Sequence, residues 1–109
     1  MVGTKRQQAI RKALRALAPG IPFGDAEAVL TLAGRPAMKA LPPGTALWLA
    51  LASHVRHVHT DYDQLLAEGY ERDAARFFVA EPSDDVLAGW GCQRSVLDGE
   101  MLEEGAPGA

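Results

Sequence analysis

The sequence predicts an all-α protein, a single compact bundle of five or six short helices around a central apolar helix. Three observations favour this fold. Alanine accounts for 19 of the 109 residues, no long stretch alternates between polar and apolar residues, and apolar residues recur three or four positions apart. The length suits one domain, which we place at residues 1–94. Residues 95–109 are expected to form a flexible acidic tail.

Two amphipathic helices are expected at the start of the chain. The first covers residues 4–18, with apolar residues on one face and basic residues on the other, and a Pro-Gly pair ends it. The second lies in the segment "IPFGDAEAVLTLAG", residues 21–34. There, Phe23 is expected to pack just ahead of a helix cap at Gly24 or Asp25.

The most apolar segment is expected to form the central helix, at residues 46–59. Its core stripe is predicted from four residues at helical spacing: Leu47, Leu51, Val55 and Val58. Trp48 and Leu49 extend the apolar surface round the helix, so the helix should be packed on several sides. A second copy of the chain that covered Trp48 or Leu49 would make a homodimer, which is one alternative.

Three short helices are expected after the central one. Thr60 and Asp63 have the spacing of a capping box, which begins a helix at residues 61–68 that Gly69 ends. A helix at residues 70–80 is expected to bury Tyr70, Ala74, Phe77 and Phe78. Pro82 is expected to break that helix. Ser83 would cap a last helix, which brings three residues to the core: Val86, Leu87 and Trp90.

All three histidines lie in the stretch "HVRHVHTDYD", residues 54–63. His54 and His57 are neighbours on a helix, and a turn at Thr60 would bring the remaining candidates toward them. Imidazole and carboxylate ligands suit zinc or non-haem iron. The candidate metal ligands are His54, His57, His59 and Asp63. In a metal-dependent hydrolase built on this site, Arg56 or Tyr62 would orient an anionic substrate.

A structural role for the same residues, with no cofactor, is the alternative that we favour. In this interpretation His54 is a buried neutral ring that bonds a backbone carbonyl. His57 and His59 lie near a helix C-terminus, where a partly charged imidazole is favoured. Asp61 and Asp63 lie in the first turn of the next helix, where acidic side chains are favoured. This interpretation requires no catalysis.

The charge of the chain is divided between its two halves. Residues 1–58 carry eight Lys and Arg against two acids, a net charge of +6, and residues 59–109 carry three against twelve, a net charge of −9. One helix face collects the candidate anion-binding residues: Lys5, Gln8, Arg11, Lys12 and Arg15. Arg35 and Lys39 would extend this surface. It is either the contact surface for an anionic partner or the solvated side of an amphipathic helix.

From these features we expect an interaction module rather than an enzyme, with a protein or nucleic acid as its partner. The single cysteine, Cys92, excludes an internal disulfide, which suits a reducing compartment. No apolar run reaches the roughly 18 residues needed to span a bilayer. A cytoplasmic protein without a membrane partner is therefore expected.

The stretch "HVRHVHTDYDQLLAEGYERDAAR" resembles the core signature of domain of unknown function 2293, a family of bacterial and some fungal proteins. The resemblance runs from "AIRKALRALAPGIPFGDAEAVL" to "VLAGW". It implies a small helical domain and supplies no activity. The motif residues to examine are Arg56, Thr60, Tyr62, Gly69, Tyr70 and Arg72. The layout of "LLAEGYERDAARFFVAEPSDDVLAGW" is also similar to the helical hairpin of ubiquitin-associated domains, which makes the Gly69-Tyr70 turn a candidate docking surface.

Overall fold

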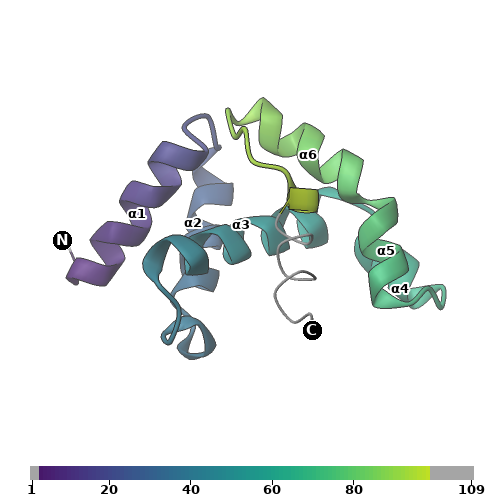
Figure 1. Ribbon diagram of the computed structural model, residues 1–109, viewed down its shortest axis with the longest axis horizontal. Coiled ribbons are helices and arrows are strands. Elements are labelled where there is room, and N and C mark those ends of the chain that lie inside the picture. The colour runs from purple at the N-terminus through teal and green to yellow at the C-terminus, as the bar shows by residue number, and fades with distance from the viewer. Residues whose placement is uncertain (1–2, 99–109) are drawn as a thin grey trace.

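Helices account for most of residues 3–98, the part of the chain that the computed structural model describes (Figure 1). The first half contains α1 (Lys5–Leu17), α2 (Phe23–Ala33), the 3-10 helix η1 (Pro36–Met38) and α3 (Pro43–His59). The second half contains α4 (Tyr62–Ala67), α5 (Arg72–Phe78) and α6 (Ala80–Gly89). Residues 3–98 contain no β-strand, so the predicted all-α class is confirmed.

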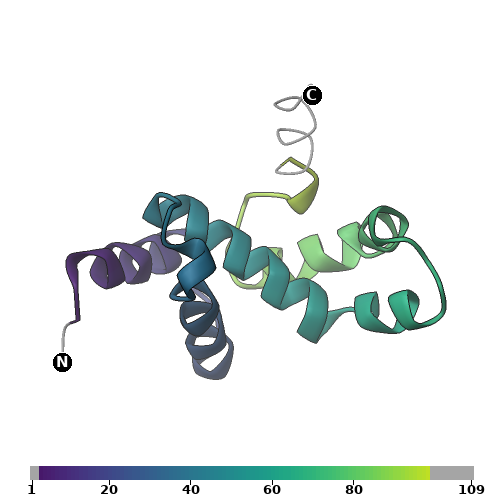
Figure 2. The same cartoon turned by 90° about the horizontal axis from the view of Figure 1, so that it is seen from below.

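The central position of α3 is confirmed. Helices α1, α2 and α6 all pack against it, and both views show α3 running through the middle of the molecule (Figures 1 and 2). Leu47, Leu51 and Val55 are fully buried, as the predicted stripe requires. Val58 is 60% exposed, so its place in that stripe was wrong. The last turn of α3 presents Val58 to solvent, whereas His54 and His59 face α2.

The N-terminal helices are positioned by a capping box and by one hydrogen bond between helices. Thr4 and Gln7 form a reciprocal capping box at the start of α1. The Arg6 guanidinium donates to the Met38 carbonyl oxygen at 2.8 Å, which ties η1 to α1. Pro22, in extended conformation, is the residue before α2. The helix therefore begins at Phe23, which is 79% exposed and does not pack as predicted.

Neither of the two caps predicted for α2 is used. Gly24 and Asp25 both lie inside the first turn of the helix, because the extended Pro22 already occupies the capping position. Asp25 is the third helical residue, and its carboxylate accepts hydrogen bonds from α3 instead of capping its own helix. Asp25, predicted as a possible local cap, therefore makes a long-range contact.

The junction between α3 and α4 differs in detail from the predicted capping box. The Thr60 hydroxyl donates to the Arg56 carbonyl oxygen and accepts from the Tyr62 N–H at 3.2 Å. Asp63 bonds His57 and makes no capping bond. The predicted stop at Gly69 is confirmed. Gly69 has φ +103°, and the Tyr70 N–H donates to the Leu65 carbonyl oxygen, as in a Schellman motif.

The helices α4 and α5 form a small second cluster at one end of the molecule. Tyr62, Ala75 and Val79 are its buried members. Three aromatic side chains that were expected to be buried are not: Tyr70, Phe77 and Phe78 are 45%, 70% and 55% exposed. Ala74, the fourth residue expected in that core, is only half-buried. One face of the seven-residue helix α5 meets α4 and α6, and Phe77 and Phe78 lie on its other faces, whereas Tyr70 lies in the turn before the helix.

The last helix carries its predicted core residues but begins earlier than expected. Pro82 lies in the first turn of α6, where its missing N–H costs no intrahelical bond. Ser83 lies inside the helix and is buried, so it is not the cap. Leu87 and Trp90 are buried and Val86 packs against the core, as predicted.

The segment after α6 is attached to the domain as far as it is described. The Ser95 hydroxyl and the Val96 N–H both donate to the Asp84 carboxylate, at 2.6 and 2.9 Å. The start of the predicted tail is therefore bonded to the middle of α6 through Ser95 and Val96, and residues 99–109 lie outside the described residues.

The two apolar residues that motivated the homodimer alternative differ in burial. Trp48 is 5% exposed, whereas Leu49 is partly buried against the main core. The homodimer alternative stays a prediction. Within residues 3–98, no helix is both long enough and apolar enough to cross a membrane.

Candidate functional site

The C-terminal part of α3 and the first turn of α2 meet at a cluster of two histidines and one aspartate. His54 Nε2 lies 2.7 Å from Asp25 Oδ1, and His59 Nε2 lies 2.7 Å from the same oxygen. His54 and Asp25 are 29 residues apart in the chain, so only the packing of α2 on α3 brings them together. We call Asp25, His54 and His59 the His–Asp cluster.

The His–Asp cluster is largely enclosed, with one open side. The side chains of His54 and Asp25 are 6% and 17% exposed, and that of His59 is 33% exposed. The two imidazole rings meet edge to face, with centroids 5.7 Å apart. Trp90, at the end of α6, packs edge-on against His59 at 5.4 Å. Three helices therefore hold the cluster, and solvent reaches it beside His59.

The charge state of the His–Asp cluster follows from its contacts. Burial raises the pKa of Asp25, whereas the hydrogen bonds and positive charge of His54 and His59 lower that pKa by more. The pKa of Asp25 therefore lies below its usual range. The carboxylate is therefore ionised at neutral pH and accepts hydrogen bonds only. Each Nε2 then donates an N–H to it when no metal is bound.

The four predicted metal ligands do not converge. His57 Nδ1 lies 2.6 Å from Asp63 Oδ1, and both side chains are exposed, at 45% and 62%. His57 also packs edge-on against Tyr62. This second pair belongs to the junction of α3 and α4 and not to the His–Asp cluster. The predicted bond between His54 and a backbone carbonyl was also wrong, because the partner of His54 is Asp25.

Sequence reasoning missed Asp25 as a member of the cluster. Its position at the start of a helix is a sufficient local reason for an acid there, so the local pattern did not indicate a long-range partner. The one signal was composition, since Asp25 and Glu27 are the only acids among residues 1–58. In the described part of the chain, Nε2 of both histidines and one carboxylate oxygen of Asp25 lie within 4.8 Å of one another. These three side chains are the ones that can share a metal ion.

The motif residues lie around the second pair rather than around the His–Asp cluster. The Arg56 guanidinium lies over the ring of buried Tyr62, 5.1 Å from its centroid. Tyr70 packs edge-on against Phe78 at 5.5 Å, and Arg72 is exposed at the start of α5. The Arg56–Tyr62 contact joins α3 to α4, and the Tyr70–Phe78 contact joins the turn after α4 to the end of α5. Their evident role is to hold this end of the molecule together.

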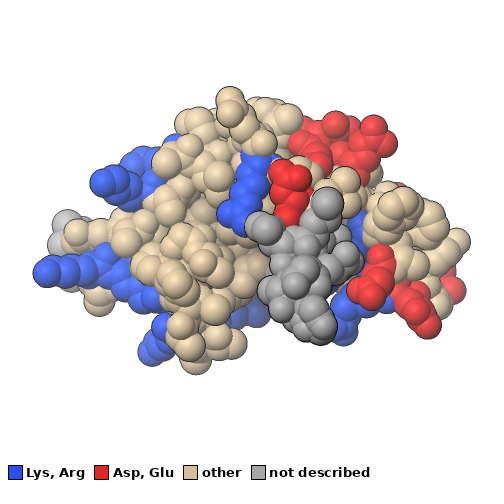
Figure 3. Space-filling view, viewed as in Figure 1, with Lys and Arg blue, Asp and Glu red and all other residues tan. Residues whose placement is uncertain are grey.

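A separate group of cations lies at the α1 end of the molecule. Figure 3 shows Lys and Arg gathered at that end and Asp and Glu at the opposite end. We call the exposed residues of α1 and of the η1 region the basic end: Lys5, Gln8, Arg11, Lys12, Arg15, Arg35 and Lys39. No ion pair joins its cations to a carboxylate of residues 3–98.

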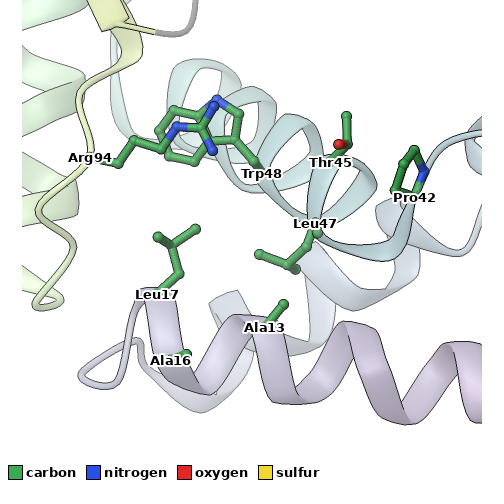
Figure 4. A pocket seen from close by; sticks show the side chains of 9 residues that line it. Ala13, Ala16, Leu17, Pro42, Thr45, Leu47, Trp48 and Arg94 are labelled. Atoms are coloured by element: carbon green, nitrogen blue, oxygen red, sulfur yellow. The ribbon is translucent and has the colours of Figure 1, made fainter.

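An open pocket of about 520 Å³ lies between α1 and the start of α3 (Figure 4). Leu17 and Ala13 of α1 face Leu47 across it. The Arg94 guanidinium stacks on Trp48 at its edge, 4.2 Å from the ring centroid. Arg94 is the one ionisable side chain that lines this pocket. The pocket therefore offers neither an acid–base pair nor a set of metal ligands.

Comparison with known proteins identifies the family of the chain but no individual relative. No curated protein and no solved structure matches the chain. A family model described as "Uncharacterized conserved protein (DUF2293)" matches residues 13–91. The match covers the described helices from the middle of α1 to the end of α6, including the His–Asp cluster and the motif residues. The chain therefore belongs to the DUF2293 family.

Proposed function

We propose that this protein is a non-enzymatic nucleic-acid-binding module that contacts the phosphate backbone through its basic end. The observation that supports the proposal is the separation of charge. Four cations of α1 are exposed without carboxylate partners, while the acids gather at the opposite end of the molecule (Figure 3). A surface of one charge attracts an anionic polymer even when the total charge of the protein is negative.

The shape of the basic end suits a linear polyanion. The 13 residues of α1 span about 20 Å, the length of roughly six phosphates along one DNA strand. The bond between Arg6 and the Met38 carbonyl brings η1 beside the start of α1, so Arg35 and Lys39 lie near the same surface. The basic end is therefore built from two segments of the chain. The solvated face of one amphipathic helix would involve only that helix.

The expected mode of binding is contact with the backbone and not with bases. Among residues 3–98, the exposed aromatic side chains are Phe23, Tyr70, Phe77 and Phe78, and the last three lie on the α4–α5 end. Phe23 lines a pocket together with Arg11 and Arg15, and this single ring is not a row of aromatic side chains on which successive bases could stack. Phosphate contacts position a protein without reading sequence, so weak sequence preference is expected.

Salt dependence tests this proposal directly. About four phosphate contacts give a hundredfold loss of affinity between roughly 50 and 200 mM salt. The measurement is fluorescence anisotropy of labelled 20-mer DNA and RNA duplexes, titrated with the full chain at several salt concentrations. The absence of binding at low salt, or binding that salt does not weaken, would exclude nucleic acid as the partner.

Two charge reversals on exposed arginines form a matched test. Arg11→Glu, on α1, is expected to weaken binding at least about fivefold and to lower the salt slope by about one. Arg72→Glu makes the same change in net charge at the other end of the molecule, where Arg72 is also exposed. It should change affinity less than about twofold. Equal losses in the two variants would mean that total charge, and not the basic end, determines binding.

A further inference from the structure

We propose that Asp25, His54 and His59 form a binding site for one divalent transition-metal ion. Two helices, α2 and α3, bring these side chains to one place, and the site is distinct from the basic end. The proposal stands apart from the proposed function, because none of the three residues belongs to the basic end. It also differs from the ligand set that the sequence indicated, because Asp25 replaces His57 and Asp63.

The donor geometry supports a shared ion. In a tetrahedral zinc site, ligand atoms about 2.05 Å from the metal are separated by about 3.3 Å. The two distances from imidazole Nε2 to Asp25 Oδ1 are 2.7 Å, and all three donor atoms lie within 4.8 Å of one another. Each contact with Asp25 would lengthen by about 0.6 Å in such a site. The separation of the two imidazole nitrogens, which is at most 4.8 Å in the structure, would also adjust to about 3.3 Å.

The donor types select the class of metal. Two imidazole nitrogens and one carboxylate oxygen suit zinc, iron and neighbouring transition metals, whereas calcium and magnesium prefer sites made of oxygen alone. Three protein ligands leave a coordination position for water. That position lies on the side where His59, 33% exposed, is open to solvent. Trp90, packed edge-on against His59, holds the orientation of that ring from α6.

The His57–Asp63 pair provides an internal control for the His–Asp cluster. It has the same chemistry, with a histidine nitrogen 2.6 Å from an aspartate oxygen, and its histidine also lies on α3. It lacks a second histidine and is exposed. A metal that bound any histidine–aspartate pair would bind there as well. A metal that requires three converging donors would bind at the His–Asp cluster alone.

The test begins with the full chain, purified without a histidine tag. Elemental analysis of the folded protein is expected to find about one equivalent of zinc or iron. After removal by a chelator, titration with Co²⁺ should give the visible absorption of a tetrahedral or five-coordinate ion. Less than about a tenth of an equivalent of metal together with no cobalt spectrum would overturn the proposal.

Three variants then locate the site. Asp25→Asn and His59→Gln are expected to lower the cobalt affinity at least tenfold, and His57→Gln is expected to leave it unchanged. Circular dichroism establishes that each variant is folded. Zn²⁺ should raise the Tm of the wild type and of His57→Gln, but not that of His59→Gln. If His57→Gln loses the metal as His59→Gln does, or if all three variants keep it, the assignment is wrong.

Discussion

Asp25 has an importance for the fold that its local sequence conceals. It joins the first turn of α2 to the end of α3 through two hydrogen bonds on a single carboxylate oxygen. A half-buried carboxylate that accepts two such bonds contributes more than an exposed ion pair, because the bonds are shielded from solvent. The His57–Asp63 pair has a similar distance but lies in solvent. Equal distances therefore do not imply equal contributions to stability.

Substitution of Asp25 is expected to lower the free energy of unfolding more than substitution of Asp63 does. In metal-free buffer at neutral pH, Asp25→Asn should lower the free energy of unfolding by about 1 to 2 kcal/mol. Asp63→Asn should lower it by less than about 0.5 kcal/mol. Urea denaturation followed by circular dichroism measures both. Equal costs would show that the His–Asp cluster is not a stabilising contact.

The contribution of Asp25 should also depend on pH in a defined direction. The pKa of Asp25 is lowered in the folded protein, with the hydrogen bonds from His54 and His59 outweighing the effect of burial. A lowered folded pKa gives stability that is fully present above the unfolded pKa, near 4. That stability is lost as pH falls through the folded pKa. The difference between wild type and Asp25→Asn should therefore shrink below about pH 4, and a constant difference would contradict this.

At the scale of single elements, glycines end α4 and α6 in the same way. Gly69 after α4 has φ +103° and Gly91 after α6 has φ +87°. In each case the N–H of the next residue, Tyr70 or Cys92, donates back into the last turn of the helix. Left-handed backbone costs an L-residue energy that glycine does not pay. These turns therefore set where α4 and α6 end.

A pair of glycine variants isolates this backbone effect. Nothing lies within 4 Å of a methyl group added at Gly69 or at Gly89, so neither substitution produces a clash. Gly69→Ala is expected to destabilise the protein by about 1 kcal/mol through backbone strain alone. Gly89→Ala, at the helical end of α6, should be neutral or stabilising by up to about 1 kcal/mol. Thermal denaturation compares them, and a neutral Gly69→Ala would show that the turn adopts another conformation.

At the scale of the whole molecule, apolar side chains divide into a main core and an exposed end. The main core surrounds α3 and is closed by α1, α2 and α6. The α4–α5 end has a small buried cluster of its own and leaves Phe77 and Phe78 in contact with solvent. The molecule is therefore elongated, with extents of 43 × 32 × 25 Å (Figure 2). Charge follows the same axis, with cations at the α1 end.

The exposure of each apolar side chain predicts how much its substitution changes the stability of the protein. Phe77→Ala should change the free energy of unfolding by less than about 0.5 kcal/mol, because the side chain is 70% exposed. Leu87→Ala, in the buried face of α6, should cost about 2 to 5 kcal/mol. Urea denaturation of the two variants is the measurement. A large cost for Phe77→Ala would mean that this ring is covered in the folded protein.

The sequence by itself determined the helical class, the central place of α3 and the glycine stop after α4, because each depends on local spacing and backbone preference. It also indicated the family through the stretch that contains the histidines. Only the tertiary structure decided which histidines share a partner. His54 and His59 are not neighbours on a helical surface, and Asp25 lies on another helix, so their meeting depends on how α2 packs against α3. Packing also exposed the α5 aromatic side chains, since a seven-residue helix with neighbours on one face cannot bury residues all round.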